Sequence, residues 1–258
     1  MDDRALPKTR HSISVFFPLY NDAPSVGVMV ARAVSVLEQC ADDWEIILVE
    51  DCSPDNVGEL ADRLAKTEPR IRVIHHETNR GYGGALRSGF AAARKDLIFY
   101  TDGDAQYDPR ELSLLLPHIE TADVVNGYKI SRGDRMIRKV LGRIYHVTVK
   151  ILFGLPLRDV DCDFRLFRRE VFDCIELESD SGVICAEMMT KVIGAGFRVV
   201  QVPVHHYPRL AGESQFFKLN RVFQLACGVA KQWVKLILFE GKYAGRARRR
   251  RLAMRPPR

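Results

Sequence analysis

The chain has 258 residues, 47% of them hydrophobic and 28% charged, which is enough to bury one sizeable core. No run approaches the about 18–20 apolar residues that cross a bilayer, and Met1-Asp2-Asp3-Arg4 lacks the apolar stretch of a secretory signal. The six cysteines form no Cys-x-x-Cys pair, so we expect reduced, mostly buried thiols in a cytosolic protein.

The net charge of +6 comes from the end of the chain. From residue 242 onward there are eight cations and no acid, namely Lys242, Arg246, Arg248, Arg249, Arg250, Arg251, Arg255 and Arg258. Without them the remaining chain carries a slightly negative charge. The basic character therefore belongs to a tail, which we expect to be disordered, and not to the fold.

Strand and helix patterns alternate along the first 125 residues. In chain order they are a strand at 13–18, a helix opened by Asn21-Asp22-Ala23-Pro24 and ending near Cys40, strands at 45–50 and 71–74, a helix from 81–84 to 94, and a strand at 97–100. This order predicts an α/β domain with a parallel sheet and right-handed crossovers.

Polar residues follow three of the predicted strands, at 18–21, 50–53 and 101–104. Parallel sheets bind their ligands at the carboxyl ends of the strands. We therefore expect these segments to form one site along a single edge of the sheet.

The segment Asp102-Gly103-Asp104-Ala105-Gln106 follows a strand directly. Two carboxylates and an amide oxygen at alternating positions can converge on Mg²⁺ or Mn²⁺, which favour oxygen ligands. The alternative is a polar turn before a helix that starts at Asp108-Pro109. Position after a strand favours the metal site.

Two further segments carry weaker signals. Glu50-Asp51-Cys52-Ser53 places acids where they can accept hydrogen bonds from a base or a ribose, but a solvated turn is the alternative. Asn79-Arg80-Gly81-Tyr82-Gly83-Gly84 opens a helix, so its backbone N–H groups can approach phosphate. A tight loop explains these glycines equally well.

Together these segments resemble the family 2 inverting glycosyltransferases. The matching residues are 18–21, 49–53, 79–86 and 102–104, in order and spacing. Later segments narrow the resemblance to the dolichol-phosphate mannose synthase and polyprenyl-phosphate glycosyltransferase branch, namely Asp159-Val160-Asp161-Cys162-Asp163-Phe164-Arg165, Glu187, 202–204 and 209–214. The resemblance covers residues 12–216 and implies a GT-A, Rossmann-like domain with a mostly parallel sheet flanked by helices.

The resemblance also implies roles for individual residues. Asp102, Asp104 and Gln106 would hold the metal, and Asp104, Arg209 and Asp161 would be the catalytic residues. Asp51 would contact the nucleotide base, and Arg209 would face the diphosphate. The full nucleotide-sugar set would be Pro18, Tyr20, Asn21, Asp22, Glu50, Asp51, Gly81, Asp102, Asp104 and Arg209. Asp22 and Glu50 depart from the acids usual in the family, which leaves the base open.

A basic stretch at 129–143 lies between the two halves of the domain. By itself it fits a solvated helix face. In the branch that the chain resembles, cations here bind the lipid phosphate, and arginine suits phosphate because its fork donates two hydrogen bonds. The expected acceptor-phosphate residues are Lys129, Arg132, Arg143 and Ser214.

Residues 218–239 show apolar and basic faces at helical spacing and include Trp233. This amphipathic helix could pack on the core or lie at a membrane interface. We therefore expect an N-terminal extension at 1–11, a GT-A domain at 12–216, the amphipathic helix at 217–240 and the basic tail at 241–258.

The predicted function is inverting transfer of one mannose- or glucose-type hexose from a GDP- or UDP-sugar to a dolichyl or undecaprenyl monophosphate. The expected location is peripheral, on the cytoplasmic face of an anionic membrane, with no specific nucleic acid and with a membrane protein as a candidate partner. Two alternatives stay open, a family 2 transferase for a saccharide or other soluble acceptor, and a non-catalytic module that binds polyanions or membranes.

Overall fold

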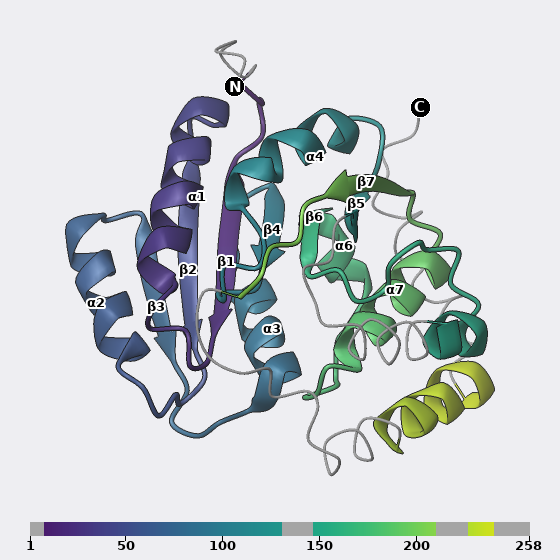
Figure 1. The fold of residues 1–258 in the computed structure, drawn as a ribbon. Helices are drawn as coiled ribbons and strands as arrows, with labels where there is room; N and C mark the ends of the chain where they lie inside the picture. The colour runs from purple at the N-terminus through teal and green to yellow at the C-terminus, as the bar shows by residue number, and fades with distance from the viewer. Residues whose placement is uncertain (1–7, 131–146, 210–226, 240–258) are drawn as a thin grey trace.

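The structure, a computed structural model, describes residues 8–130, 147–209 and 227–239 (Figure 1). The strands are β1 (Ile13–Leu19), β2 (Trp44–Glu50), β3 (Ile71–His75), β4 (Leu97–Thr101), β5 (Val124–Lys129), β6 (Phe164–Arg168) and β7 (Val199–Val204). The helices are α1 (Val26–Cys40), α2 (Val57–Thr67), α3 (Gly81–Ala92), η1 (Pro109–Glu111), α4 (Leu112–Ile119), α6 (Glu170–Cys174), α7 (Ile184–Gly194) and a helix at 147–153. A helical segment at 227–233 continues into the π-helical turn η3 (Val234–Phe239).

The seven strands form one sheet in the order β3-β2-β1-β4-β6-β5-β7. Strands β1 to β4 pair in parallel, as do β5 and β7. Strand β6 runs antiparallel to both of its neighbours, β4 and β5. The sheet is therefore mostly parallel, as predicted, and its parallel strands direct their carboxyl ends to one edge.

Two helical layers cover the sheet, because successive side chains of each strand point to opposite faces. Val15 and Phe17 of β1 pack into one core with α1, α2 and α4. Phe16 packs on the other face into a second core with α3, α6 and α7. All seven residues of β1 and of β2 are buried, as expected for central strands covered on both faces.

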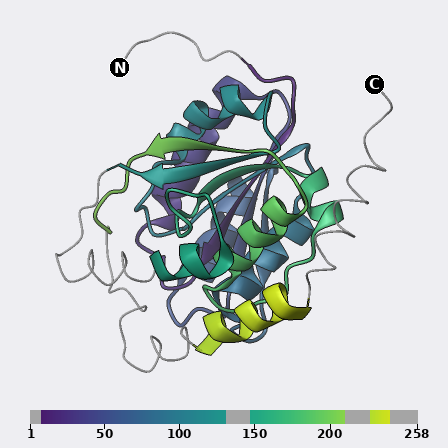
Figure 2. The same cartoon turned by 90° about the vertical axis from the view of Figure 1, so that its right-hand side faces the viewer.

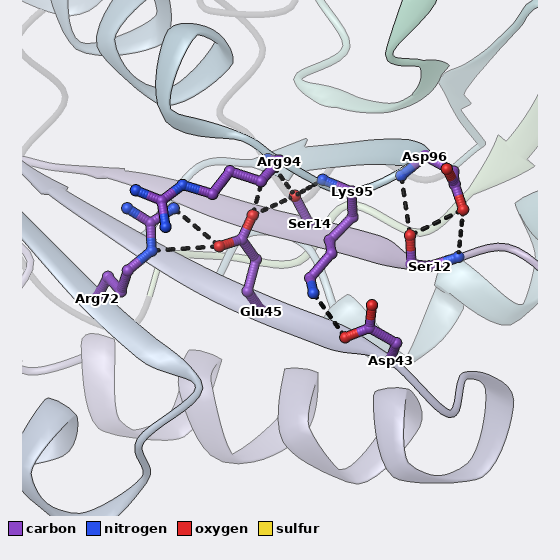
Figure 3. A network of polar contacts seen from close by, with 8 residues as sticks. All are labelled: Ser12, Ser14, Asp43, Glu45, Arg72, Arg94, Lys95 and Asp96. Carbon is purple, nitrogen blue, oxygen red and sulfur yellow. Dashed lines mark hydrogen bonds and ion pairs between the residues drawn. The ribbon is translucent and has the colours of Figure 1, made fainter.

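A polar network closes the amino-terminal edge of the sheet (Figure 3). The buried Glu45 carboxylate on β2 accepts hydrogen bonds from Ser14 Oγ at 2.7 Å, Arg72 Nη2 at 2.8 Å and the Arg94 N–H at 2.8 Å. These contacts join β1, β2, β3 and the start of β4. They also lower the pKa of Glu45 despite its burial. Both carboxylate oxygens of Glu45 thus have donors within the chain, so this network stabilises the sheet.

The described part of the C-terminal segment, yellow in Figure 1 and Figure 2, lies beside the helix at 147–153 and the loop at 178–183. Val229 and Leu236 are buried in the second core, and Trp233 Nε1 donates to the Leu152 carbonyl at 2.7 Å. Residues 227–236 thus follow the core-packing alternative. Residues 218–226 and the basic tail lie outside the described residues, and the membrane-facing helix is not confirmed. No helix among the described residues is both long and apolar enough to cross a membrane.

The predicted strands of the first half are confirmed to within one or two residues. The first helix begins later than predicted, at Val26 after a turn at 23–25, and it has no side-chain cap from Asp22. The backbone carbonyl of Asp22 accepts from the Ser25 and Val26 N–H groups, while its carboxylate accepts from the Tyr20 N–H. All six cysteines are free, four of them buried, as expected.

The glycines at the start of α3 are required by close packing. A Cβ on Gly83 would lie 2.1 Å from the Ser179 carbonyl oxygen and 2.7 Å from the Asp180 carbonyl carbon. The Gly83 N–H also donates to the Asp180 carbonyl at 2.9 Å. Close packing of α3 against a second loop of the chain therefore accounts for this glycine.

We expect Gly83→Ala to lower the free energy of unfolding by about 1–3 kcal/mol, because the loop at 178–182 must shift to admit the methyl group. Gly27→Ala in α1 is the matched control, since a Cβ there meets nothing within 4 Å. The control should be neutral or stabilising by up to about 1 kcal/mol. Urea denaturation of the two variants measures the difference, and equal stabilities would contradict this account of the packing.

Candidate active site

Within residues 8–130, 147–209 and 227–239, three non-glycine residues adopt left-handed backbone conformations, all after strands that end at the carboxyl edge. They are Asn21 after β1 (φ 60°), Cys52 after β2 (φ 51°) and Ala105 after β4 (φ 61°). Such conformations cost about 1–2 kcal/mol for a residue with a Cβ and gather where the surrounding structure imposes them for function. The strain marks the edge that the sequence analysis singled out.

The ends of β1 and β2 are tied together by side chains. The Asn21 N–H donates to Ser53 Oγ at 2.9 Å, and the Ala23 N–H donates to Asp55 at 3.0 Å. Buried Glu50 accepts from the Ser53 N–H and contacts His75 Nδ1 at 3.0 Å. Glu50 thus shapes the loop after β2 and is engaged by the chain itself.

Asp51 is the buried acid that begins the loop after β2. Its Oδ1 lies 2.6 Å from His76 Nδ1 and accepts from the Arg80 N–H at 2.8 Å. Its carbonyl accepts from Asn79 Nδ2 at 2.9 Å. The start of α3 is therefore fixed to the end of β2, and the Gly81 N–H is used within this loop by Asn79 Oδ1 at 3.2 Å.

Three carboxylates crowd the ends of β1 and β4, those of buried Asp22 and Asp104 and that of half-buried Asp102. Burial raises the pKa of Asp22 to about 7, with a further rise from Asp104. Burial also raises the pKa of Asp102 well above its ordinary range, and Asp163 and Asp104 add to the effect. The pKa of Asp104 is raised by burial against the opposing field of Arg209. A cluster of this kind favours a bound cation, because a cation relieves the repulsion.

Arg209 supplies a positive charge from the segment after β7. Its Nη2 lies 2.6 Å from Oδ2 of Asp104. Gln106 holds the same segment, because the Tyr207 N–H donates to the Gln106 carbonyl at 2.8 Å. The Gln106 side chain lies 3.4 Å from the Tyr207 carbonyl through Nε2, which leaves its amide oxygen available as an acceptor.

Asp102 accepts a hydrogen bond from a side chain of α3. The Tyr82 hydroxyl donates to Oδ1 of Asp102 at 2.8 Å. The loop at 178–182 packs against the start of this helix. Buried Glu187 orders this loop by accepting from the Glu178 and Ser179 N–H groups at 3.0 and 2.9 Å. Lys191 Nζ compensates the Glu187 carboxylate at 2.8 Å.

The loop at 159–163 brings further acids beside the cluster. Fully buried Arg165 anchors it, donating to the Val160 carbonyl, to the Tyr100 hydroxyl and, at 2.6 Å, to Asn126 Oδ1. Lys129 Nζ donates to the Asp161 carbonyl at 2.7 Å. Burial, reinforced by Asp159, raises the pKa of Asp161 to about 7.

The structure brings most of the predicted residues to one edge. Pro18 lies in β1 and Tyr20 directly after it, while Lys129 ends β5 and is already engaged by the loop at 159–163. Arg132, Arg143 and Ser214 lie outside the described residues. Among the described residues, no three His, Cys, Asp or Glu side chains converge as a complete metal site, so a cation here would draw ligands from beyond these side chains.

Sequence reasoning did not single out Tyr82, His76 or Lys191. Tyr82 lay inside a motif interpreted through its glycines, and the other two lay outside every motif. No local pattern marks Tyr82 or His76, because their partners Asp102 and Asp51 are identified by the folded structure. Lys191 follows Glu187 by four residues on α7, a spacing at which helical side chains meet, and this was the local signal available for it.

The glycosyl transferase family 2 model matches residues 14–176 of the chain. The chain belongs to this family. Glycosyltransferase AglD of Haloferax volcanii is 32% identical over 87% of this chain and 37% of the relative. An undecaprenyl-phosphate mannosyltransferase of Micrococcus luteus is 29% identical over 79% of this chain and 86% of the relative. An undecaprenyl-phosphate 4-deoxy-4-formamido-L-arabinose transferase of an Enterobacter species is 30% identical over 80% of this chain and 63% of the relative.

The chain therefore spans nearly all of one of these relatives but under two thirds of the other two. Among solved structures, glucosyl-3-phosphoglycerate synthase from Mycobacterium tuberculosis, in a complex with Mn²⁺, UDP and glucosyl-3-phosphoglycerate, aligns with a TM-score of 0.67. That alignment covers 88% of this family 2 chain and 80% of the synthase at 16% identity, so it supports the fold alone. The predicted fold class and family are confirmed.

The elevated pKa of Asp161 makes stability depend on pH. The folded chain holds a proton on this carboxyl up to about pH 7, whereas the unfolded chain releases it near 3.8. Between these values the folded state binds more protons, so this group makes stability fall as pH rises through the window. In metal-free buffer, Asp161→Asn should gain thermal stability relative to wild type at about pH 8 more than at about pH 5.

Differential scanning fluorimetry at both pH values gives the comparison. Asp42→Asn is the control, because the Asp42 side chain is 78% exposed. A stability difference for Asp161→Asn that is the same at both pH values, as for the control, would mean that Asp161 is already ionised in the folded protein.

Proposed function

We propose that this chain transfers one hexose, with inversion, from a nucleoside diphosphate sugar to a polyprenyl monophosphate. The observation that carries the proposal is the pair Asp102 and Asp104 at the end of β4, with Arg209 against Asp104, in a member of glycosyl transferase family 2. Two of the similar proteins are named as undecaprenyl-phosphate sugar transferases, which supports this acceptor class.

We propose a divalent cation, Mg²⁺ or Mn²⁺, at this acidic pair. The structural neighbour binds Mn²⁺ together with UDP, and another of its complexes holds Mg²⁺ and UDP. Asp102, Asp104 and the amide oxygen of Gln106 offer the hard oxygen donors that both ions prefer. When bound, the cation would neutralise negative charge on the leaving nucleoside diphosphate. The surplus of buried carboxylates at this edge fits such an ion.

Around this centre, the remaining predicted residues would hold the donor. Asp51 would accept from the base, with Glu50 shaping its loop. Pro18, Tyr20, Asn21 and Asp22 would line the nucleoside from β1, and Gly81 would border it from α3. Arg209 would donate its fork to the diphosphate and exchange part of its contact with Asp104 for phosphate oxygens.

The acceptor phosphate needs no strong base, because it is already anionic near neutral pH and can attack the anomeric carbon directly. The work of the protein would be alignment and stabilisation of the leaving group. Asp161 fits a role in positioning the acceptor, since it sits beside Lys129 in the loop at 159–163. Arg132, Arg143 and Ser214 would complete the acceptor-phosphate site.

A test of this function uses the full chain with Mn²⁺, a panel of GDP- and UDP-hexoses, and either undecaprenyl phosphate or dolichyl phosphate. We expect one donor to be consumed with formation of a lipid-linked monosaccharide. Asp104→Ala should lower turnover by at least about 1000-fold and remove metal-dependent donor binding, while unfolding temperature changes little. Product is measured by extraction of radiolabelled lipid.

The acceptor panel should include free saccharides, because a family 2 transferase with a saccharide or other soluble acceptor is the second candidate. Transfer to sugar and not to lipid would favour that candidate. Normal turnover by Asp104→Ala would overturn the metal assignment. A wild-type chain that binds vesicles but consumes no donor would be the non-catalytic polyanion- or membrane-binding module.

We also propose a peripheral location on the cytoplasmic face of the membrane, where a polyprenyl acceptor is reached from the surface, with a membrane protein as a further candidate partner. The eight cations at 242–258 support this, since a cation near anionic lipid contributes about 1 kcal/mol. Exposed apolar side chains add to the support at Val147, Ile151 and Leu152 of the helix at 147–153 and at Val234 beside it.

Vesicle flotation tests this location. We expect the full chain to float on phosphatidylglycerol vesicles and a chain ending at Glu240 to float less, with the difference shrinking as salt screens the tail. Truncation after 240 is the suitable change, because Val229 and Leu236 pack in the core and an earlier end would disturb the fold. Equal flotation of the two chains at low salt would exclude the tail as an anchor.

A further inference from the structure

His76 is a buried histidine directly after β3, and both of its ring nitrogens have partners. Its Nδ1 lies 2.6 Å from Oδ1 of Asp51, and its Nε2 lies 2.8 Å from Oγ of Ser88 on α3. The side chains of His76 and Asp51 are only 2% and 5% exposed. The contact therefore links the loop after β2 to α3 within the protein interior.

A carboxylate oxygen accepts hydrogen bonds, so the ring N–H at Nδ1 is the donor in the contact with Asp51. Nε2 contacts the Ser88 hydroxyl, which can either donate to this nitrogen or accept from it. The imidazole therefore has a partner on each side, Ser88 on α3 and Asp51 after β2.

The two carboxylate oxygens of Asp51 differ in their hydrogen bonds. Oδ1 takes both the imidazole N–H and the Arg80 N–H, the latter at 2.8 Å. Oδ2 accepts no hydrogen bond from the part of the chain that the structure describes. Two donors on one oxygen fix the plane of the carboxylate, so the second oxygen keeps one direction at the carboxyl edge of β2.

We propose that His76, held by Ser88, is a positioning residue for nucleobase recognition that acts through Asp51. The inference rests on the proposed nucleoside diphosphate donor. An oriented carboxylate oxygen accepts from the ring N–H of uracil or guanine and meets a bare ring nitrogen in cytosine or adenine. Loss of the imidazole N–H frees the carboxylate to turn, so discrimination between bases falls while the contacts to the diphosphate persist.

Calorimetric titration of the full chain with UDP, GDP, CDP and ADP in Mn²⁺ measures this discrimination. We expect wild type to bind UDP or GDP at least about tenfold more tightly than CDP and ADP. His76→Leu should reduce that ratio about tenfold, mainly by weakening the preferred nucleotide. His76→Asn should keep the ratio within about threefold, because its amide can donate from the position of Nδ1.

His118→Leu, an exposed site on α4, is the matched control and should leave the ratio unchanged. A wild-type chain that binds none of the four nucleotides would reject the proposed function itself. Wild type that binds all four equally, or His76→Leu that discriminates like wild type, would overturn the inference and leave the function standing. An equal loss in His76→Asn and His76→Leu would also overturn it, since a donor at the position of Nδ1 would then not preserve the discrimination.

Thermal unfolding shows whether each variant is folded. Where His76→Leu does not fold, Ser88→Ala decides, because it removes the partner of Nε2 and keeps the ring in place. We expect Ser88→Ala to lower the ratio by about threefold. An unchanged ratio in that variant would overturn the inference.

Discussion

Repulsion between buried carboxylates governs the carboxyl edge of this sheet. Asp163 raises the pKa of both Asp102 and Asp104, and Asp104 raises the pKa of Asp102 further. Buried charges of one sign persist only where cations compensate them. Here Arg165 does so from beneath the loop at 159–163 and Arg209 from the segment after β7, so both of these segments are placed by the acids that they neutralise.

The acids at the two edges of the sheet differ in the direction of their pKa shifts. At the amino edge, Glu45 is equally buried, but Ser14, Arg72 and the backbone of Arg94 satisfy it and its pKa falls. At the carboxyl edge the pKa values of Asp22, Asp102 and Asp104 rise. The same residue chemistry thus stabilises one edge and prepares the other for a cationic or hydrogen-bond-donating ligand. Stability is lowered at the second edge in exchange for that capacity.

The second half of the chain contributes support more than ligands. Glu187 and Lys191 form a buried pair that orders the loop at 178–182, and that loop fits only against the glycines that open α3. Tyr82 of the same helix then reaches Asp102. Lys235 of the C-terminal segment pairs with Glu178 of this loop. A substitution far along the chain can therefore alter the geometry of the acidic pair without touching it.

The sequence by itself determined the local elements and the edge at which the site lies. Apolar runs such as 45–50 and 97–100 predict central strands, and Asp102 and Asp104 follow one of them directly, so their position needed no tertiary information. Only the tertiary structure decided that β6 runs antiparallel, that Arg209 lies on Asp104 and that His76 holds Asp51. Each of these contacts joins positions distant in the chain, and their distance depends on crossover geometry and side-chain packing, which local periodicity does not encode.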